Sequence, residues 1–336
     1  MNRPFHALRR ALGIAAVCAL ALPAAWAGQA KYPTMVVFGD SLSDTGNVFI
    51  ATSAPPSPFA IPPSVSPRAT YWQGRFTNGP VAVEYLWRLV ARKNDAQVTP
   101  SLAVPAQQAK SAVSFAFGGS TSGGLTPSPL GGLVPGLQAQ VAQFTGALGP
   151  KKASSQALYV VWSGSNDYLQ QTPQAPADPH TVVANVASAI RTLYAQGARD
   201  FLVPNLADLG ITPFATFNGV GATLTLQSQS HNALLKATLT GLERELRQSR
   251  IVELDVLKLG AALLSTGLIS ADIPALEYLA PGTGALDCLF RDPASCVDVA
   301  QPAFMPPFLF WDVMHPTTQV HGVLGTAMFG ALLTQR

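Results

Sequence analysis

One serine of the chain has the surroundings that a nucleophile needs. The apolar run Met35–Phe38 stops at Gly39, and hydroxyl and carboxylate side chains then gather in "MVVFGDSLSDTGNVF". A serine hydroxyl attacks weakly unless a base lies within hydrogen-bond reach and a third group orients that base. Ser41 follows the apolar run directly, so it is the first candidate for a nucleophile displayed at the end of a buried strand.

A histidine and an aspartate near the C-terminus could complete such a site. Among the histidines after residue 28, only His315 has a carboxylate at close spacing in a loop-like segment, "WDVMHPTT". Asp312 lies three residues earlier, and positions i and i+3 of one helical turn share a face. Asp312 could therefore accept from one imidazole nitrogen and leave the other facing Ser41. His321, by contrast, is expected to be a packed or capping residue.

Acyl transfer also needs hydrogen-bond donors for a developing oxyanion. The stretch "SFAFGGSTSGG" contains Gly118 and Gly119, where a bare backbone N–H can approach a substrate. The stretch "VVWSGSNDYL" contains Asn166, whose side-chain amide is a second donor. Taken singly, the glycines also suit a tight turn and the asparagine a turn cap. These residues can serve as oxyanion donors only if the fold brings them beside Ser41.

The segments that must position these residues alternate between strand and helix patterns. Short apolar runs typical of buried parallel strands are "TMVVFGD", "ALYVVWSG", "DFLVPNL" and "RIVELDV". Helical spacing is found over residues 180–198, 226–249 and 317–335, the last with Thr317 or Thr318 as N-cap. The alternation predicts one α/β domain with a parallel sheet between two helical layers. The candidate residues follow the carboxyl ends of strands, where such sheets place their sites.

Four stretches together resemble a known family. The sequences "FGDSLSDTGN", "FAFGGSTSG", "WSGSND" and "DVMHP" resemble, in this order, the successive blocks of the GDSL-type (SGNH) serine hydrolases. The resemblance runs from about residue 35 to 320. "GRFTNGPVAVEYL" and "VPNLADLGITP" are similar to segments of its bacterial phospholipase/lecithinase/hemolysin-like lipase branch.

The resemblance implies a flavodoxin-like three-layer α/β/α sandwich. It also implies Ser41, rather than Ser43, as nucleophile, with His315 as base and Asp312 as its orienting group. The implied oxyanion hole consists of the Ser41 N–H, the Gly118 N–H and the Asn166 side chain, with Gly119 as the alternative glycine. No cofactor or metal is expected to be needed.

The expected activity is hydrolysis of carboxylic esters of lipid-like substrates through an acyl-enzyme on Ser41. A lipid acyltransferase or a carbohydrate O-deacetylase would use the same residues, and an exported binding protein on a dead hydrolase fold is the alternative that is not an enzyme. The aromatic residues before the histidine either line an acyl pocket or pack in the core: Phe304, Phe308, Phe310 and Trp311. Transient contact with a membrane surface is compatible with a lipid substrate.

The N-terminal segment and the cysteine content indicate export. Residues 1–27 combine early arginines, a short apolar run and "AWA", which predicts a cleaved signal peptide and a single catalytic domain over residues 28–336. The protein is then secreted or periplasmic. After cleavage two cysteines remain, Cys288 and Cys296, and an even pair in an oxidising compartment predicts a disulfide. A net charge of +3 gives no nucleic-acid footprint, and the oligomeric state is left open.

Overall fold

The computed structural model describes residues 32–55, 59–104, 111–127, 133–281, 287–290, 292–300 and 306–335. The predicted signal peptide lies outside these residues. At the centre is a six-stranded sheet with the strand order β2-β3-β1-β6-β7-β8, and all of its pairings are parallel. Its strands are β1 (Met35–Gly39), β2 (Thr99–Pro100), β3 (Ala112–Ser114), β6 (Leu158–Trp162), β7 (Asp200–Pro204) and β8 (Arg250–Leu254).

The strand order fixes where a site can form. Setting aside the short edge strand β2, the chain pairs β1 first with β3 on one side and then with β6 on the other. This is the flavodoxin-like order, and the reversal of direction between β1 and β6 opens a crevice at their carboxyl ends. Ser41 follows β1 and Asn166 follows β6. The fold expected from the sequence is therefore confirmed.

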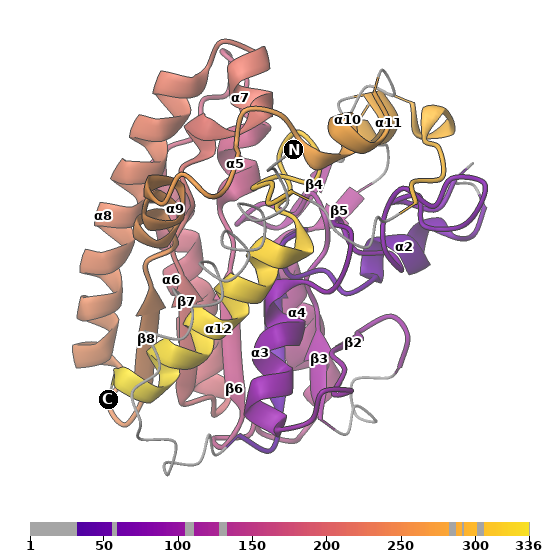
Figure 1. Ribbon diagram of the computed structural model, residues 1–336. Helices are drawn as coiled ribbons and strands as arrows, with labels where there is room; N and C mark the ends of the chain where they lie inside the picture. The colour runs from indigo at the N-terminus through magenta and orange to yellow at the C-terminus, as the bar shows by residue number, and fades with distance from the viewer. Residues whose placement is uncertain are drawn as a thin grey trace.

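Helices cover both faces of the sheet (Figure 1). One face packs against α4 (Leu137–Leu148), α6 (Pro179–Gln196) and α8 (Gly221–Glu245). The other packs against α3 (Ala82–Ala91), α9 (Val256–Ser265) and α12 (Thr318–Thr334), and Figure 1 shows α12 crossing in front of the sheet beside α3. Strand β1 serves both layers because its side chains alternate: Val36 and Phe38 face the first, Met35 and Val37 the second.

Shorter elements surround the carboxyl edge of the sheet. They are α2 (Asn47–Thr52), the hairpin β4 (Leu125–Pro127) and β5 (Leu133–Pro135), α5 (Ser165–Leu169), η2 (Leu209–Ile211), α7 (Pro213–Phe217), α10 (Ala275–Leu279), α11 (Asp287–Phe290) and η3 (Pro293–Ser295). A separate apolar cluster there includes Tyr71, Trp311 and both cysteines. Cys288 and Cys296 form a disulfide, as predicted.

Several predicted elements agree with the structure in detail. The four apolar runs are β1, β6, β7 and β8, and α6 ends before Gly197 as its pattern indicates. Helix α8 begins at Gly221, earlier than its apolar spacing predicts, and α12 has Thr317 as N-cap residue. Among the described residues, no helix is long and apolar enough to cross a membrane.

Candidate active site

The structure brings the predicted serine, histidine and aspartate together. Ser41 Oγ lies 2.9 Å from His315 Nε2, and His315 Nδ1 lies 2.7 Å from Asp312 Oδ2. Asp312 is fully buried, and His315 is 5% exposed. The Phe76 ring lies against the imidazole, with 5.3 Å between the ring centroids. In this arrangement a histidine can take the proton of a serine hydroxyl while an aspartate fixes its orientation.

A side-chain turn, rather than a helical turn, sets the spacing between Asp312 and His315. Asp312 Oδ1 accepts the backbone N–H groups of Met314 and His315 at 2.9 Å and 2.8 Å. The chain therefore folds around the carboxylate itself, which is the local pattern that aspartate favours. Tyr71 donates its hydroxyl to Asp312 Oδ2 at 2.8 Å.

The end of β1 is shaped by close backbone packing. A Cβ on Gly39 would meet the carbonyl oxygen of Trp162 on the neighbouring strand, so the strand can pass there only as glycine. Gln140 of α4 accepts the Gly39 N–H at 2.9 Å and donates to the Gly39 carbonyl at 2.8 Å. This buried glutamine gives the Gly39 N–H a partner beyond the end of β3, whereas the Gly39 carbonyl also accepts the Phe117 N–H at 3.2 Å. Its only sequence signal is a polar residue on the apolar face of a helix.

Asp44 organises the turn that carries the serine, and this overturns the assignment of Gly118 as an oxyanion donor. Its carboxylate accepts the backbone N–H groups of Gly46, Asn47 and Val48. It also accepts the Gly118 N–H at 2.9 Å, so that donor is already used. In addition, a Cβ at this glycine would meet the ring of the phenylalanine that packs on the histidine.

Gly119 is the alternative glycine. No partner for its N–H is found among the described residues, and its φ of 81° favours glycine. Ser41 N–H likewise has no partner within the described part of the chain. Asn166 uses one amide hydrogen on the Ser120 carbonyl at 3.0 Å, which leaves the other for a ligand. These three donors therefore meet the chemical requirement for an oxyanion site.

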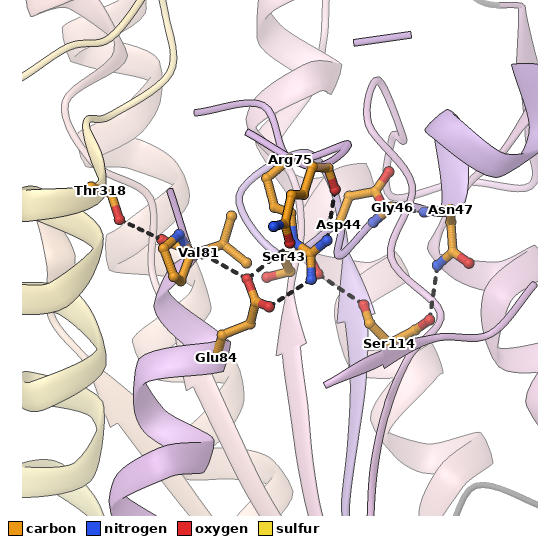
Figure 2. Close-up of polar contacts among 11 residues, drawn as sticks. Ser43, Asp44, Gly46, Asn47, Arg75, Val81, Glu84, Ser114 and Thr318 are labelled. Atoms are coloured by element: carbon orange, nitrogen blue, oxygen red, sulfur yellow. Dashed lines mark hydrogen bonds and ion pairs between the residues drawn. The ribbon is translucent and has the colours of Figure 1, made fainter. Parts of the chain in front are cut away.

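Asn47 and Ser43 fasten the same turn to its neighbours. Asn47 Nδ2 donates to the Ser114 carbonyl, and the Ser43 carbonyl accepts the Ser114 hydroxyl (Figure 2). Asn47 Nδ2 also donates to the Ala116 carbonyl. The Ser43 hydroxyl is fully buried and has no hydrogen-bond partner among the described residues. Ser43 is therefore enclosed in the turn, whereas Ser41 lies against the histidine.

Asp40 is a buried carboxyl group directly beside Ser41. It is 2% exposed, and its Oδ1 accepts the Leu42 N–H at 3.0 Å. Burial raises the pKa of Asp40 to about 7; the Leu42 N–H and His315 lower it, and Asp167 raises it. Through the contact with Leu42 N–H, Asp40 braces the turn that carries Ser41.

His321, His231 and Arg75 have structural partners. His321 Nδ1 accepts the Ala82 N–H, and burial lowers the pKa of this histidine to about 3, so it is a packed, capping residue as expected. His231 contacts the Tyr168 hydroxyl in the core. Arg75 forms an ion pair with Glu84 at 2.7 Å (Figure 2). The described residues contain no group of three or more metal-ligating side chains.

An apolar cavity of about 290 Å³ opens from the serine and histidine. Its wall includes Asp40, Asn166 and Phe310. One helix, α9, contributes aliphatic residues to it: Val256, Leu257, Leu259, Leu263 and Leu264. Of the aromatic residues considered for an acyl pocket, Phe310 lines the cavity, whereas Phe308 and Trp311 pack in the separate apolar cluster. Phe304 lies outside the described residues.

Helix α9 is the main functional element that the sequence reading missed. Asn205, at the end of β7, accepts the Val256 N–H at 2.7 Å and donates to Asp255, and Asp255 caps the helix through Lys258 N–H. The apolar stretch that follows β8 could have identified it, because seven of its ten residues are valine, leucine or alanine. Gly260 lies in the middle of this wall, and a Cβ there would meet no atom within 4 Å.

In this parallel α/β/α sandwich, a serine, a histidine and an aspartate meet beyond the carboxyl ends of the strands. Such an arrangement can catalyse hydrolysis through a serine nucleophile. The model of the family described as GDSL-like lipase/acylhydrolase matches residues 35–328. The chain belongs to this family, and it is a carboxylic ester hydrolase.

Relatives of the chain cover most of its length. A phosphatidylcholine-sterol acyltransferase of Aeromonas hydrophila is 26% identical over 329 residues, which cover 87% of this chain and 88% of the relative. A GDSL esterase/lipase of Arabidopsis thaliana is 27% identical over 328 residues, which cover 85% and 84%. The crystal structure of a lipolytic G-D-S-L family protein from Veillonella parvula aligns with a TM-score of 0.42 at 10% identity, covering 90% of this chain and 97% of that one.

Proposed function

We propose that this protein hydrolyses esters of long acyl chains through an acyl-enzyme on Ser41. The observation that carries the proposal is the apolar cavity that begins at Ser41 and His315 and continues along α9. Ligand pockets match the polarity of the group they take, so an aliphatic wall favours an alkyl chain over a sugar ring or a bare acetyl group.

The proposed reaction begins with proton transfer. Ser41 Oγ attacks the ester carbonyl carbon while His315 Nε2, at 2.9 Å, takes the hydroxyl proton. The tetrahedral intermediate then collapses, the bond to the alcohol oxygen breaks, and that oxygen takes the proton from Nε2. Water next attacks the acyl-serine with His315 again as base, which releases the fatty acid and restores the serine. Asp312 holds the ring in place and stabilises the imidazolium throughout.

The intermediate also needs stabilisation of its negative oxygen. We assign this task to the backbone N–H groups of Ser41 and Gly119 and to the second amide hydrogen of Asn166. Each donor of this kind lowers the barrier by roughly 3–4 kcal/mol when it is held in place before the reaction. Gly118 instead holds the turn, because its N–H is bound by Asp44.

The first experiment compares p-nitrophenyl esters from acetyl to palmitoyl with four purified variants. Ser41→Ala should lose activity, whereas Ser43→Ala, an equal change two residues away, should keep it. Gly260→Leu fills open space in the cavity wall and should reduce kcat/KM for octanoyl and palmitoyl esters by about 10-fold or more, while acetyl ester changes by about 2-fold or less. Gly241→Leu is the matched control, because Gly241 also lies within a helix with no atom near its Cβ.

The outcomes separate the parts of the proposal. Full activity in Ser41→Ala would contradict the nucleophile. Equal losses on short and long esters in Gly260→Leu would contradict the acyl site. A strong preference of the parent enzyme for acetyl esters would favour an O-deacetylase, and absence of activity on every ester, with no labelling of Ser41 by a fluorophosphonate, would favour a binding protein.

A second candidate function is acyl transfer to an alcohol. It is favoured by the relative named as a phosphatidylcholine-sterol acyltransferase, which covers 87% of this chain. The same acyl-enzyme would be attacked by an alcohol in place of water. Adding a sterol to a phosphatidylcholine assay and measuring the ratio of steryl ester to free fatty acid decides between the two, because a pure hydrolase forms only the acid.

We also propose that the protein is exported. The leader-like residues 1–27 support this, and so does the Cys288–Cys296 disulfide, which belongs to oxidising compartments. Mass determination of the mature protein from culture medium and periplasm would test both the cleavage after Ala27 and the location.

A further inference from the structure

We propose that Tyr71 is a positioning residue for the Asp312–His315 pair. We propose further that the Cys288–Cys296 disulfide holds Tyr71 in place through residues 297–298, which follow it. The inference rests on the proposed function of that pair. The segment around the disulfide is not proposed to control access to the cavity, because none of the described residues between 287 and 300 lines the cavity.

The contact between Tyr71 and Asp312 is buried and specific. The Tyr71 hydroxyl donates to Asp312 Oδ2 at 2.8 Å, and this is the same oxygen that lies 2.7 Å from His315 Nδ1. Tyr71 is 3% exposed and Asp312 is fully buried. Burial, together with the neighbouring carboxylate, raises the pKa of Tyr71 well above its usual range, so the phenol remains a donor.

The hydroxyl of Tyr71 completes the hydrogen bonding of the Asp312 carboxylate. Oδ1 is held by two backbone N–H groups, and Oδ2 is shared by the tyrosine and the imidazole. A buried carboxylate with fewer donors is less well stabilised and freer to rotate. A donor on Oδ2 also withdraws negative charge from the atom that holds the imidazolium. Tyr71 therefore acts on both the orientation and the basicity of His315.

The residues just before Tyr71 are tied to the segment that follows the disulfide. Asp298 Oδ1 accepts the Ala69 N–H at 2.6 Å, and the Thr70 hydroxyl donates to the Val297 carbonyl at 2.6 Å. The Ser66 hydroxyl adds a hydrogen bond to Asp298 Oδ2 at 2.8 Å. These bonds fix the backbone on the N-terminal side of the tyrosine ring. Figure 1 shows this C-terminal segment beside the loop that follows α2.

The disulfide links this tie to the core. Cys288 and Cys296 are both buried in the apolar cluster that contains Tyr71 and Trp311. Cys296 directly precedes the two residues that bind the loop. When the disulfide is reduced, Val297 and Asp298 remain attached to a segment that is held less firmly in the apolar cluster. A chain of contacts therefore runs from the disulfide through residues 297–298 and residues 69–70 to the carboxylate.

The decisive measurement requires no turnover. The imidazole of His315 is followed by NMR in protein labelled at histidine Cε1, with His315→Asn used for assignment. Tyr71→Phe keeps the ring and removes the hydroxyl, so we expect a shift of the His315 titration midpoint upward by about one pH unit. If Ser41 is the nucleophile, kcat should also fall with little change in KM, and the acid limb of kcat/KM should move to higher pH.

The disulfide is tested by the double variant Cys288→Ser/Cys296→Ser and by Asp298→Asn, each with and without Tyr71→Phe. Both should move the midpoint of His315, and their effects should disappear once Tyr71→Phe is present. An unchanged midpoint in Tyr71→Phe would overturn the role of Tyr71. Effects that simply add to that of Tyr71→Phe would overturn the role of the disulfide, and a disulfide variant that fails to fold leaves Asp298→Asn to decide. Since the midpoint is read without substrate, a failure of the proposed function would appear separately, as missing ester activity with the expected shift intact.

Discussion

Replacement of Asp40 by asparagine should make the protein more stable at neutral pH. The side chain is 2% exposed, and burial raises the pKa of Asp40 to about 7, from the ordinary value of 3.8. The groups that act on it are the Leu42 N–H and His315, which lower the pKa, and Asp167, which raises it. The folded protein therefore keeps a proton on Asp40 between pH 4 and pH 7, where the unfolded chain has lost it.

The sign and size of the effect follow from that difference. Because the folded state binds more protons in this range, the free energy of unfolding falls as the pH rises from about 4 to about 7. A difference of about three pKa units corresponds to about 4 kcal/mol. Asparagine is neutral at every pH, so Asp40→Asn should escape this loss. Its stability relative to the parent protein should rise by about 4 kcal/mol across that range and stay constant above it.

Urea unfolding at a series of pH values from 4.5 to 8.5 measures the effect. The quantity of interest is the difference in free energy of unfolding between Asp40→Asn and the parent protein, because contributions of all other groups cancel in it. Ser43→Ala is the control: it alters the same turn without a titratable group, so its difference should not depend on pH. A difference for Asp40→Asn that is constant across the series would refute the argument that this carboxyl is neutral when buried.

Two further predictions concern the oxyanion site and the ion pair between Arg75 and Glu84. Asn166→Ala removes one donor of the oxyanion site and should lower kcat for p-nitrophenyl esters by about 10²–10³-fold at little changed KM; a change confined to KM would contradict this role. Glu84→Ala leaves the Arg75 guanidinium, 14% exposed, without its partner and should cost about 3–5 kcal/mol of unfolding free energy. Glu245→Ala breaks an ion pair with Arg191 at the same 2.7 Å distance, but both side chains are nearly half exposed, so it should cost much less stability than Glu84→Ala. Equal losses in urea unfolding would refute the argument from burial.

The three candidate residues that the structure brings together share one property. Each is marked by its neighbours in the sequence: Ser41 follows an apolar strand, and Asp312 and His315 lie within one short turn. Parallel strands then bring their carboxyl ends to one edge without further information. The same holds for the disulfide, whose cysteines are eight residues apart.

The residue that distinguishes the two glycines lies far from them in the sequence. Gly118 and Gly119 are adjacent and chemically identical, and only the distant Asp44 distinguishes them, because it accepts the N–H of Gly118. Gln140 is similar: it is a polar residue in an apolar helical pattern until β1 ends against it. Hydrogen bonds between residues far apart in sequence leave no spacing that a pattern can detect.

The sequence by itself determined the α/β architecture, the four principal strands and the identity of the serine, histidine and aspartate. Only the tertiary structure decided which of the two glycines Asp44 binds, that Tyr71 contacts Asp312, and that α9 contributes to the wall of the cavity. The physical reason is that periodicity records which side of one element is buried, whereas a cavity or a long-range hydrogen bond depends on where two elements meet. That meeting is settled by packing of the whole chain.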